Sequence, residues 1–133
     1  MAARRRYPRV AVDGLVVHAD RLVTVRRGTE PFRGMLALPG GFVELGEPLE
    51  DAVVREVREE TGLETRLVRF VGAFSDPKRD PRGHVVSIAY ALAETAGTLR
   101  AGSDAAEIML VDPDAPPRMA FDHNEIVRRW RGG

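Results

Sequence analysis

The stretch "PLEDAVVREVREETG", from Pro48 to Gly62, has the pattern of an amphipathic helix with a signal at each end. Proline is tolerated at the first helical position and glycine is favoured just past the last one, so the helix is predicted to span residues 48–61. At about 100° per residue, one side of this helix is an apolar stripe made of Val53, Val54 and Val57. The helix can therefore bury its valines against a core.

The same helix carries three carboxylates close together, at Glu56, Glu59 and Glu60. They fall within an arc of roughly 100° beside the apolar stripe, where like charges repel by roughly 0.2–0.5 kcal/mol per pair. One interpretation is a solvated acidic face, as in most runs of charge. The other is a site for Mg²⁺ or Mn²⁺, which prefer oxygen ligands and commonly bridge carboxylates to substrate phosphates. The nearby "PGG" favours the second, because Gly40 can bring a bare backbone carbonyl to the same place.

Composition excludes several other classes of site. The chain has 0 cysteines and 3 histidines, so thiolate sites are excluded and a zinc site is hard to assemble. Lys and Arg (20) balance Asp and Glu (20), which leaves no global basic field to attract nucleic acid. No stretch approaches the roughly 20 apolar residues of a membrane span, and "MAARRRYPRV" lacks the apolar core of a secretory signal. We expect one cytoplasmic domain over residues 1–133, without a membrane or nucleic-acid partner, with a short basic tail at residues 1–8.

The rest of the chain alternates β-branched runs with turn signals. Two runs meet near Ala19-Asp20 in a predicted hairpin, and "PGG" (residues 39–41) is a predicted break. A second helix is predicted over residues 121–130, with Asp122 as its N-cap and Trp130 packing it onto the sheet. Strands are predicted at residues 9–20, 21–28, 35–38, 65–74, 84–93 and 106–111. Strands before, between and after two separated helices indicate an α+β fold with a mixed sheet, not a regular βαβ repeat.

The helix and the loop before it resemble the Nudix box, G-x5-E-x7-R-E-U-x-E-E-x-G-U, in which U is aliphatic. Every position of the pattern is satisfied, by Gly41, Glu47, Arg55, Glu56, Val57, Glu59, Glu60, Gly62 and Leu63. The strand order around the box also resembles the Nudix fold, an α/β/α sandwich with a mixed β-sheet between helices. The resemblance therefore extends over nearly the whole chain.

The resemblance implies a metal-dependent hydrolase of a nucleoside diphosphate linked to another group. Arg55 and Glu47 would hold the loop against the helix. The implied ligands of Mg²⁺ or Mn²⁺ are Gly40, Glu56, Glu59 and Glu60. The general base that takes a proton from the attacking water stays open among Glu44, Glu59, Glu60, Asp104 and Glu107.

A second motif, "SDPKRDPRGH", follows the predicted strand at residues 65–74. It is either an ordinary hairpin loop or a loop that binds phosphate or ribose, and Pro77 would shape it. The side chains available for binding are Lys78, Arg79, Arg82 and His84. The motif is similar to a loop in the ADP-ribose pyrophosphatase branch of the family, where a proline about fifteen residues past the box is a marker. "LPGGFVE" and "FDH" are also typical of that branch, so ADP-ribose, cleaved to AMP and ribose 5-phosphate, is the favoured substrate.

Leu36 stands where many relatives have a tryptophan before "PGG", so adenine stacking must come from elsewhere. Phe32, Phe74 and Tyr7 are candidates, although each is more often core or surface, and His123 is expected to cap or pack.

Alternative substrates are an ADP-sugar, a dinucleotide or an oxidised nucleoside triphosphate such as 8-oxo-dGTP. The alternatives of other classes are a domain that senses ADP-ribose without turnover and a non-catalytic structural protein. The sensors carry an additional DNA-binding region, for which "MAARRRYPR" is too short, and the intact box argues for turnover. Many relatives with the second motif pair as dimers, which raises the expectation of a homodimer.

Overall fold

The computed structural model describes residues 6–102 and 104–132. The predicted basic tail falls mostly on residues 1–5, outside the described part, and residues 6–8 are exposed. The elements in chain order are β1 (Arg9–His18), β2 (Arg21–Arg27), β3 (Leu36–Ala37), β4 (Gly40–Phe42), α1 (Leu49–Thr61), β5 (Leu63–Phe74), β6 (Val85–Gly97), β7 (Ala105–Val111) and α2 (His123–Trp130). Both predicted helices and all six predicted strands are present, with shifted ends.

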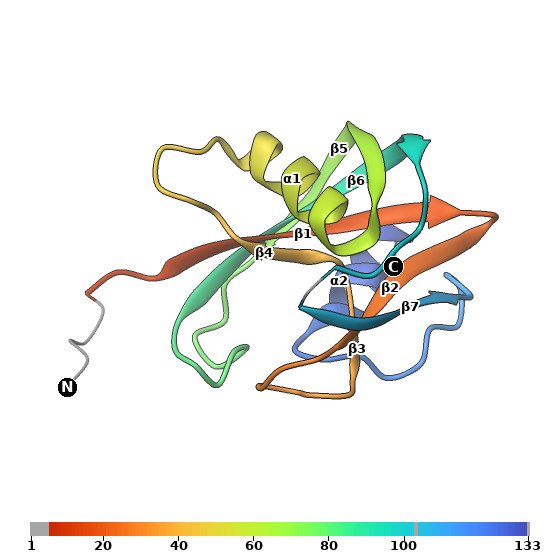
Figure 1. The fold of residues 1–133 in the computed structure, drawn as a ribbon. Helices are drawn as coiled ribbons and strands as arrows, with labels where there is room; N and C mark the ends of the chain where they lie inside the picture. Colours follow the sequence, from red (N-terminus) through yellow and green to blue (C-terminus); the bar gives the residue numbers. More distant parts are fainter. Residues whose placement is uncertain (1–5, 103, 133) are drawn as a thin grey trace.

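The sheet is mixed, and β1 is its central strand (Figure 1). The order is β3-β2-β1-β6-β5, while β4 pairs with β1 and β7 pairs with β2. β1 runs parallel to β6 and antiparallel to β4, and its last residues turn to form the hairpin with β2. The predicted hairpin is confirmed: Ala19 and Asp20 both have positive φ, 51° and 64°, as a two-residue type I′ turn requires.

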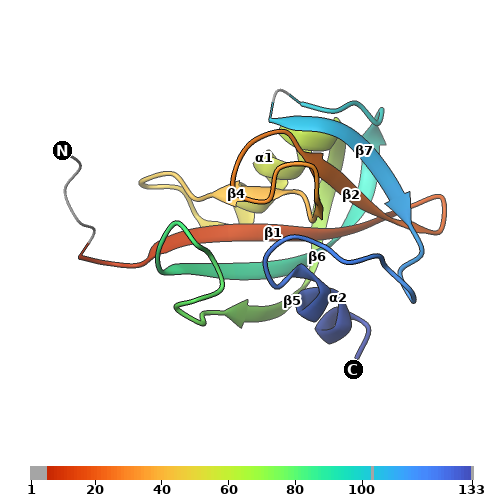
Figure 2. The same cartoon turned by 90° about the horizontal axis from the view of Figure 1, so that it is seen from below.

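The two helices cover opposite faces of the sheet, as the views in Figures 1 and 2 show. On one face, Val53 and Val57 of α1 are fully buried against β1 and β5. On the other face, Ile126 and Val127 of α2 belong to a second apolar cluster, and Trp130 is partly buried against it. This arrangement confirms the α+β sandwich and the packing predicted for Trp130. Within the described residues, no helix is both long and apolar enough to span a membrane.

One prediction about the fold is confirmed only in part: Leu38 and Pro39 separate β3 from β4, but the two glycines of "PGG" belong to β4. Gly40–Phe42 form β4, which pairs antiparallel with Ala11–Asp13 of β1. The pairing is very close, because a Cβ atom on Gly40 would lie 2.5 Å from Oδ1 of Asp13. A short strand beginning just after Pro39 tolerates the proline, and the glycine permits the approach.

Candidate active site

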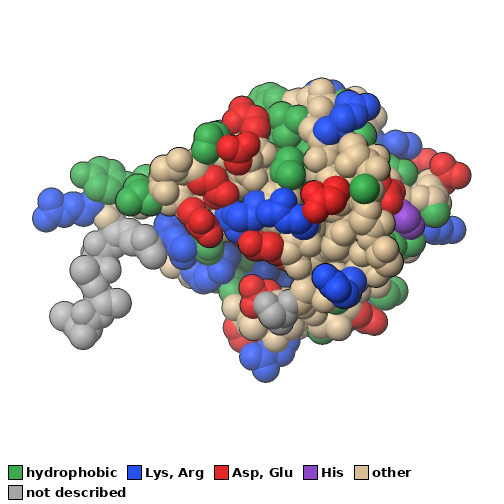
Figure 3. Space-filling model, turned by 45° about the horizontal axis from the view of Figure 1, so that its top comes forward, with side chains coloured by type: hydrophobic (Ala, Val, Ile, Leu, Met, Phe, Trp, Pro, Cys, Tyr) green, Lys and Arg blue, Asp and Glu red, His purple; other side chains and the backbone are tan. Residues whose placement is uncertain are grey.

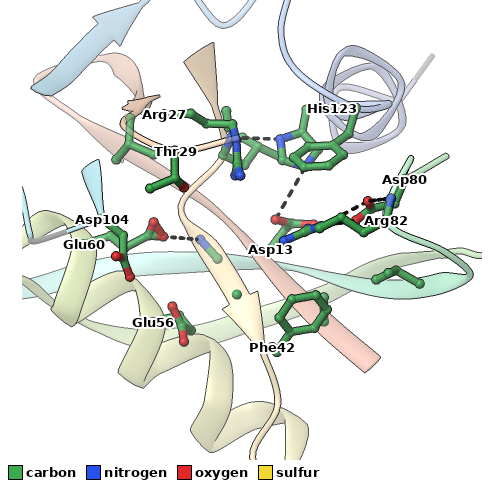
Figure 4. Close-up of a pocket in the computed structure, with 18 of the residues that line it drawn as sticks. Asp13, Arg27, Thr29, Phe42, Glu56, Glu60, Asp80, Arg82, Asp104 and His123 are labelled. Atoms are coloured by element: carbon green, nitrogen blue, oxygen red, sulfur yellow. Dashed lines mark hydrogen bonds and ion pairs between the residues drawn. The ribbon is translucent and has the colours of Figure 1, made fainter. Parts of the chain in front are cut away.

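A cavity of about 300 Å³ opens between α1, β4 and the loop that connects β5 to β6 (Figure 4). Its wall also includes residues of β1, β2 and the segment leading into α2. Acidic and basic side chains gather together on the face of the molecule that carries α1 (Figure 3). The cavity therefore joins segments that are distant in the sequence and rich in charge.

Two glycines bring the backbone of β4 against the carboxylates of α1. A Cβ atom on Gly41 would lie 2.5 Å from the carboxyl group of Glu56, so only glycine leaves room for that group. The N–H of Gly40 donates to Oε1 of Glu60 at 3.0 Å. The glycine pair thus fixes Glu56 and Glu60 on the cavity wall.

Arg55 ties the loop before α1 to the helix, as the resemblance implied. Its Nε and Nη2 donate to the two carboxylate oxygens of Glu47, at 2.7 and 2.9 Å. Its Nη1 donates to Glu56 at 2.8 Å and to Glu59 at 3.2 Å, and its Nη2 also reaches the carbonyl of Phe42. The hydrogen bonds from Arg55 lower the pKa of Glu47 to about 2. Arg55 is therefore a positioning residue, which orients the loop and the carboxylates around it.

Glu60 and Glu56 are held where their charged forms are destabilised. Burial raises the pKa of Glu60 to about 8, against the lowering effect of the hydrogen bond from Gly40, and the neighbouring carboxylates Glu56, Asp13 and Asp104 raise it further. Burial also raises the pKa of Glu56, despite the opposing effect of Arg55. A hard divalent cation would stabilise two such partly buried carboxylates, because it offsets both their desolvation and their mutual repulsion.

The residues present fit such a cation. Of the predicted ligand set, Gly40, Glu56 and Glu60 line the cavity; Gly40 donates its N–H to Glu60, and its carbonyl stays a predicted ligand. Within residues 6–102 and 104–132, no three His, Asp or Glu side chains already form a metal-binding group. Glu59 is 55% exposed and turned to Arg55, so only Glu56 and Glu60 of the predicted carboxylates line the cavity. Mg²⁺ commonly binds through one or two carboxylates and completes its shell with water and substrate phosphates. A pair of carboxylates is therefore a sufficient protein contribution.

Two arginines lie across the cavity from this acidic wall (Figure 4). Arg27, at the end of β2, donates from Nε to the carbonyl of Pro31 at 2.6 Å. Burial lowers its pKa, and the positive charge of Arg82 lowers it further. Because Arg82 is already paired with the carboxylate of Asp80, Arg27 is the better placed of the two to bind an anion in the cavity.

The loop after β5 contributes two of its predicted binding residues to the cavity wall, Arg79 and Arg82. Arg79 has a side chain only 4% exposed, and its Nε and Nη2 donate to the carboxylate of Asp122 at 2.9 and 2.6 Å. That pair explains why Asp122 stands at the N-cap position of α2 without capping the helix. Arg79 therefore fastens the loop to α2.

The other residues predicted in this loop lie away from the cavity wall. Pro77 and Lys78 are exposed, and the backbone N–H of Lys78 is held by the carboxylate of Asp76 at 2.8 Å. His84 is exposed and its Nε2 lies 3.0 Å from the carbonyl oxygen of Ser75, closing the base of the loop. These three residues shape the loop, and the structure does not bring them to the cavity.

A buried histidine, His123, also lies on the cavity wall. His123 is 4% exposed, and its Nδ1 accepts the N–H of Leu38 at 3.0 Å, so the neutral ring carries its proton on Nε2. That Nε2 lies 3.6 Å from Oδ1 of Asp13, whose other oxygen accepts the hydroxyl of Ser87. Burial lowers the pKa of His123, which keeps the ring neutral. His123 is thus a packing residue, as predicted, but it also fixes Asp13.

Comparison with known proteins identifies the fold and the box together. Residues 7–130 match the NUDIX domain. The chain belongs to the Nudix family. It is 47% identical over 130 residues to an ADP-ribose pyrophosphatase from Methanocaldococcus jannaschii, covering 96% of this chain and 77% of that protein.

Two solved structures have the same Nudix fold. A MutT/nudix family protein from Enterococcus faecalis aligns with a TM-score of 0.83 and 31% identity, over 97% of this chain and 62% of that one. A bifunctional NMN adenylyltransferase/ADP ribose pyrophosphatase from Francisella tularensis, complexed with AMP and a manganese ion, aligns with a TM-score of 0.81 and 26% identity. That alignment covers 98% of this chain and 43% of the other. The chain thus spans less than two thirds of both solved proteins.

The candidates for the general base that lie outside α1 differ in their position relative to the cavity. Asp104 lines the cavity beside Glu60. Glu107 instead forms an ion pair with Arg26 across β7 and β2 and is not on the cavity wall. Glu44 is 69% exposed and lies 3.8 Å from Arg55. The geometry therefore favours Asp104 over Glu107 and Glu44.

The predicted stacking aromatics are not the ones on the cavity wall. Phe74 is 6% exposed within the core, and Tyr7 is 79% exposed outside the cavity. Phe32 packs edge-on against Phe121, with ring centroids 4.7 Å apart. Phe121 itself lines the cavity, together with Phe42. The signal for these two was their position in "LPGGFVE" and "FDH", segments already typical of the ADP-ribose branch.

Proposed function

We propose that this Nudix domain hydrolyses ADP-ribose to AMP and ribose 5-phosphate with the help of Mg²⁺ or Mn²⁺. The observation that carries the proposal is the cavity itself, in which partly buried Glu56 and Glu60 lie across from Arg27. A pair of carboxylates that can hold a cation, opposite an arginine that can bind phosphate oxygens, fits a metal-bound diphosphate. The likeness to the M. jannaschii ADP-ribose pyrophosphatase supports the choice of substrate.

Glu56 and Glu60 would hold the divalent cation, with Gly40 keeping Glu60 in place through its N–H. When bound, the cation neutralises charge on the diphosphate and lowers the pKa of a coordinated water. Arg55 keeps the box loop rigid through its two bonds to Glu47, so the carboxylates need little rearrangement during the reaction. Arg27 binds phosphate oxygens on the opposite wall.

Asp104 is the proposed general base. It lies on the cavity wall next to Glu60, whereas Asp13 and Asp80, elsewhere on the cavity wall, already accept hydrogen bonds from Ser87 and Arg82. Its carboxylate takes a proton from the attacking water as the water oxygen bonds to one phosphorus atom. The bridging P–O bond breaks at that phosphorus, and the leaving phosphate takes the bond's electron pair. The products are two phosphate monoesters.

The experiment is a product analysis with the purified protein, Mg²⁺ and a substrate panel. ADP-ribose, ADP-glucose, a dinucleotide and 8-oxo-dGTP are incubated separately, and products are resolved by ion-exchange chromatography. We expect AMP and ribose 5-phosphate from ADP-ribose, with the highest kcat/KM of the panel, and no release in EDTA. Faster turnover of another substrate would refute the assignment to ADP-ribose. Tight binding of ADP-ribose without turnover would instead indicate a sensor.

We further propose that two copies of the chain associate. β5 is an edge strand of the sheet, and it exposes Val68 (54%) and Phe70 (57%) to solvent. Apolar side chains on an open edge offer a surface that a second copy can cover. Light scattering after size-exclusion chromatography should give about twice the chain mass of 14.7 kDa, and a monomer mass would refute this.

A further inference from the structure

A chain of buried polar groups crosses the sheet and ends on the backbone just before β4. The hydroxyl of Ser87 donates to Asp13, and Nε2 of His123 lies 3.6 Å from the other carboxylate oxygen of Asp13 (Figure 4). A carboxylate facing Nε2 favours the tautomer with the proton on that nitrogen, which leaves Nδ1 as an acceptor. Nδ1 accepts the N–H of Leu38 at 3.0 Å. The side chain of His123 therefore holds the backbone at Leu38 with a specific hydrogen bond.

Three successive residues, from the end of β3 into β4, each have a hydrogen bond to another part of the chain. The partners are His123 for the N–H of Leu38, Gly14 for the carbonyl of Pro39 and Glu60 for the N–H of Gly40. Glu60 belongs to α1 and His123 to α2, so helices on opposite faces of the sheet hold the same short segment. Because the ring of Pro39 fixes its φ, a displacement at Leu38 is passed on to Gly40.

β4 has little freedom to move without disturbing the carboxylates of α1. It is three residues long and pairs with residues 11–13 of β1. A Cβ atom on Gly40 would lie 2.1 Å from the carbonyl oxygen of Val12, and one on Gly41 would lie 2.5 Å from the carboxyl group of Glu56. A small displacement of this strand therefore changes its contacts with both Glu56 and Glu60.

We propose that His123 is a positioning residue for the cation site. By holding the N–H of Leu38, it keeps Gly40 where its own N–H reaches Glu60. The inference rests on the proposed function, since it takes Glu56 and Glu60 to hold the cation. It also goes beyond a packing role, because packing needs only an apolar group of suitable volume, whereas positioning needs an acceptor at Nδ1.

Two substitutions of His123 separate these roles. His123→Leu fills a similar volume and lacks the acceptor. His123→Asn is smaller, but its amide oxygen can take the position of Nδ1 and accept the N–H of Leu38. A packing role predicts that leucine replaces histidine better than asparagine does, and a positioning role predicts the reverse.

The first measurement is the amide proton resonance of Gly40, by NMR of the full chain in EDTA, where neither metal nor substrate is present. The second is the affinity for Mn²⁺, followed by electron paramagnetic resonance. In His123→Leu we expect an upfield shift of the Gly40 amide proton, as its hydrogen bond to Glu60 lengthens, and Mn²⁺ affinity lower by about tenfold. In His123→Asn we expect both quantities to stay close to those of the wild type.

Val127→Ala is the matched control for a general loss of stability. Val127 is 2% exposed on the same helix, and its truncation should lower the free energy of unfolding measured with urea. It should change neither the Gly40 resonance nor the affinity for Mn²⁺. The positioning role is refuted if His123→Leu keeps the wild-type values, if His123→Asn loses as much as His123→Leu, or if Val127→Ala loses Mn²⁺ affinity to the same extent.

The release of AMP from ADP-ribose is measured on the same proteins and reports separately on the proposed function. Hydrolysis by the wild type, with an unchanged Gly40 resonance and Mn²⁺ affinity in His123→Leu, overturns the positioning role alone. A Gly40 resonance and Mn²⁺ affinity that depend on the acceptor, without hydrolysis of ADP-ribose, support the positioning role and overturn the choice of substrate.

Discussion

Glu60→Gln should stabilise the protein in the absence of metal while abolishing its activity. The folded protein raises the pKa of Glu60 from 4.5 to about 8, chiefly through burial. At pH 7.5 the folded protein without metal therefore holds this carboxyl group mostly protonated, and protonating it about three pH units above its ordinary pKa costs about 4 kcal/mol at 1.36 kcal/mol per unit. Local relaxation and water entry reduce this to between about 2 and 4 kcal/mol. Glutamine is nearly isosteric, stays neutral and can still accept the N–H of Gly40.

The sign of the pH dependence follows from the direction of the shift. A carboxyl group whose pKa is raised on folding contributes stability that is fully present below pH 4.5 and is lost as the pH rises through 8. The free energy of unfolding of the wild type in EDTA should therefore fall, relative to Glu60→Gln, between pH 5 and pH 8. The two proteins should have nearly the same stability at the acid end of this range.

Urea denaturation in EDTA at pH 5, 6, 7 and 8 measures this difference, and adding Mg²⁺ measures the effect of the cation. Mg²⁺ should stabilise the wild type at pH 8 more than it stabilises Glu60→Gln, whose affinity for the cation is expected to be lower. Glu50→Gln, on the exposed side of the same helix, is the matched control and should behave as the wild type. A variant that is destabilised equally at every pH, or that gains as much from Mg²⁺ as the wild type, would contradict this reasoning.

Asp104→Asn should lower kcat by about a hundredfold at unchanged Tm, because the proposed base is lost. Glu107→Gln, away from the cavity wall, should leave kcat unchanged. Equal losses of kcat in the two variants would argue against Asp104 as the base. Gly41→Ala places a Cβ atom 2.5 Å from the carboxyl group of Glu56 and should displace that group. Titration calorimetry should then show the affinity for Mg²⁺ reduced at least tenfold. An unchanged affinity would contradict the close packing. Arg79→Ala leaves the partly buried carboxylate of Asp122 without its ion-pair partner, so the free energy of unfolding should fall by about 3 kcal/mol. Lys78→Ala, on the exposed part of the loop, should change the free energy of unfolding by less than about 0.5 kcal/mol. Similar urea midpoints for these last two variants would show that the ion pair does not anchor the loop.

The box and its helix could be predicted from sequence because their contacts are local. The arc shared by the carboxylates depends only on helical geometry, and Arg55 meets Glu47 only eight residues away. Glu59 was placed among the ligands because it lies on the same arc. The structure turns it to Arg55 and solvent, a choice of side-chain direction that spacing alone does not decide.

Apart from Arg79 and Arg82, the far wall of the cavity could not be predicted, because its contacts join distant segments. His123 meets Leu38 across 85 positions, and Ser87 meets Asp13 across 74. One signal was present: Asp13 is a charged residue in the middle of the β-branched run "RVAVDGLVVH", where burial is costly without partners. The backbone conformation of Phe121 had no signal in the sequence, since its positive φ is imposed by packing and not by its residue type.

The binding of Mn²⁺, followed by electron paramagnetic resonance, tests most directly whether the carboxylates of α1 hold a cation against a diphosphate. Free Mn²⁺ is measured during titration of the wild type and of Glu60→Gln, each with and without a non-hydrolysable methylene analogue of ADP-ribose. We predict that the wild type binds Mn²⁺, that the analogue tightens this binding, and that Glu60→Gln loses at least tenfold in affinity. Equal Mn²⁺ affinity in the two proteins, with no effect of the analogue on either, would contradict a metal-bound diphosphate in this cavity.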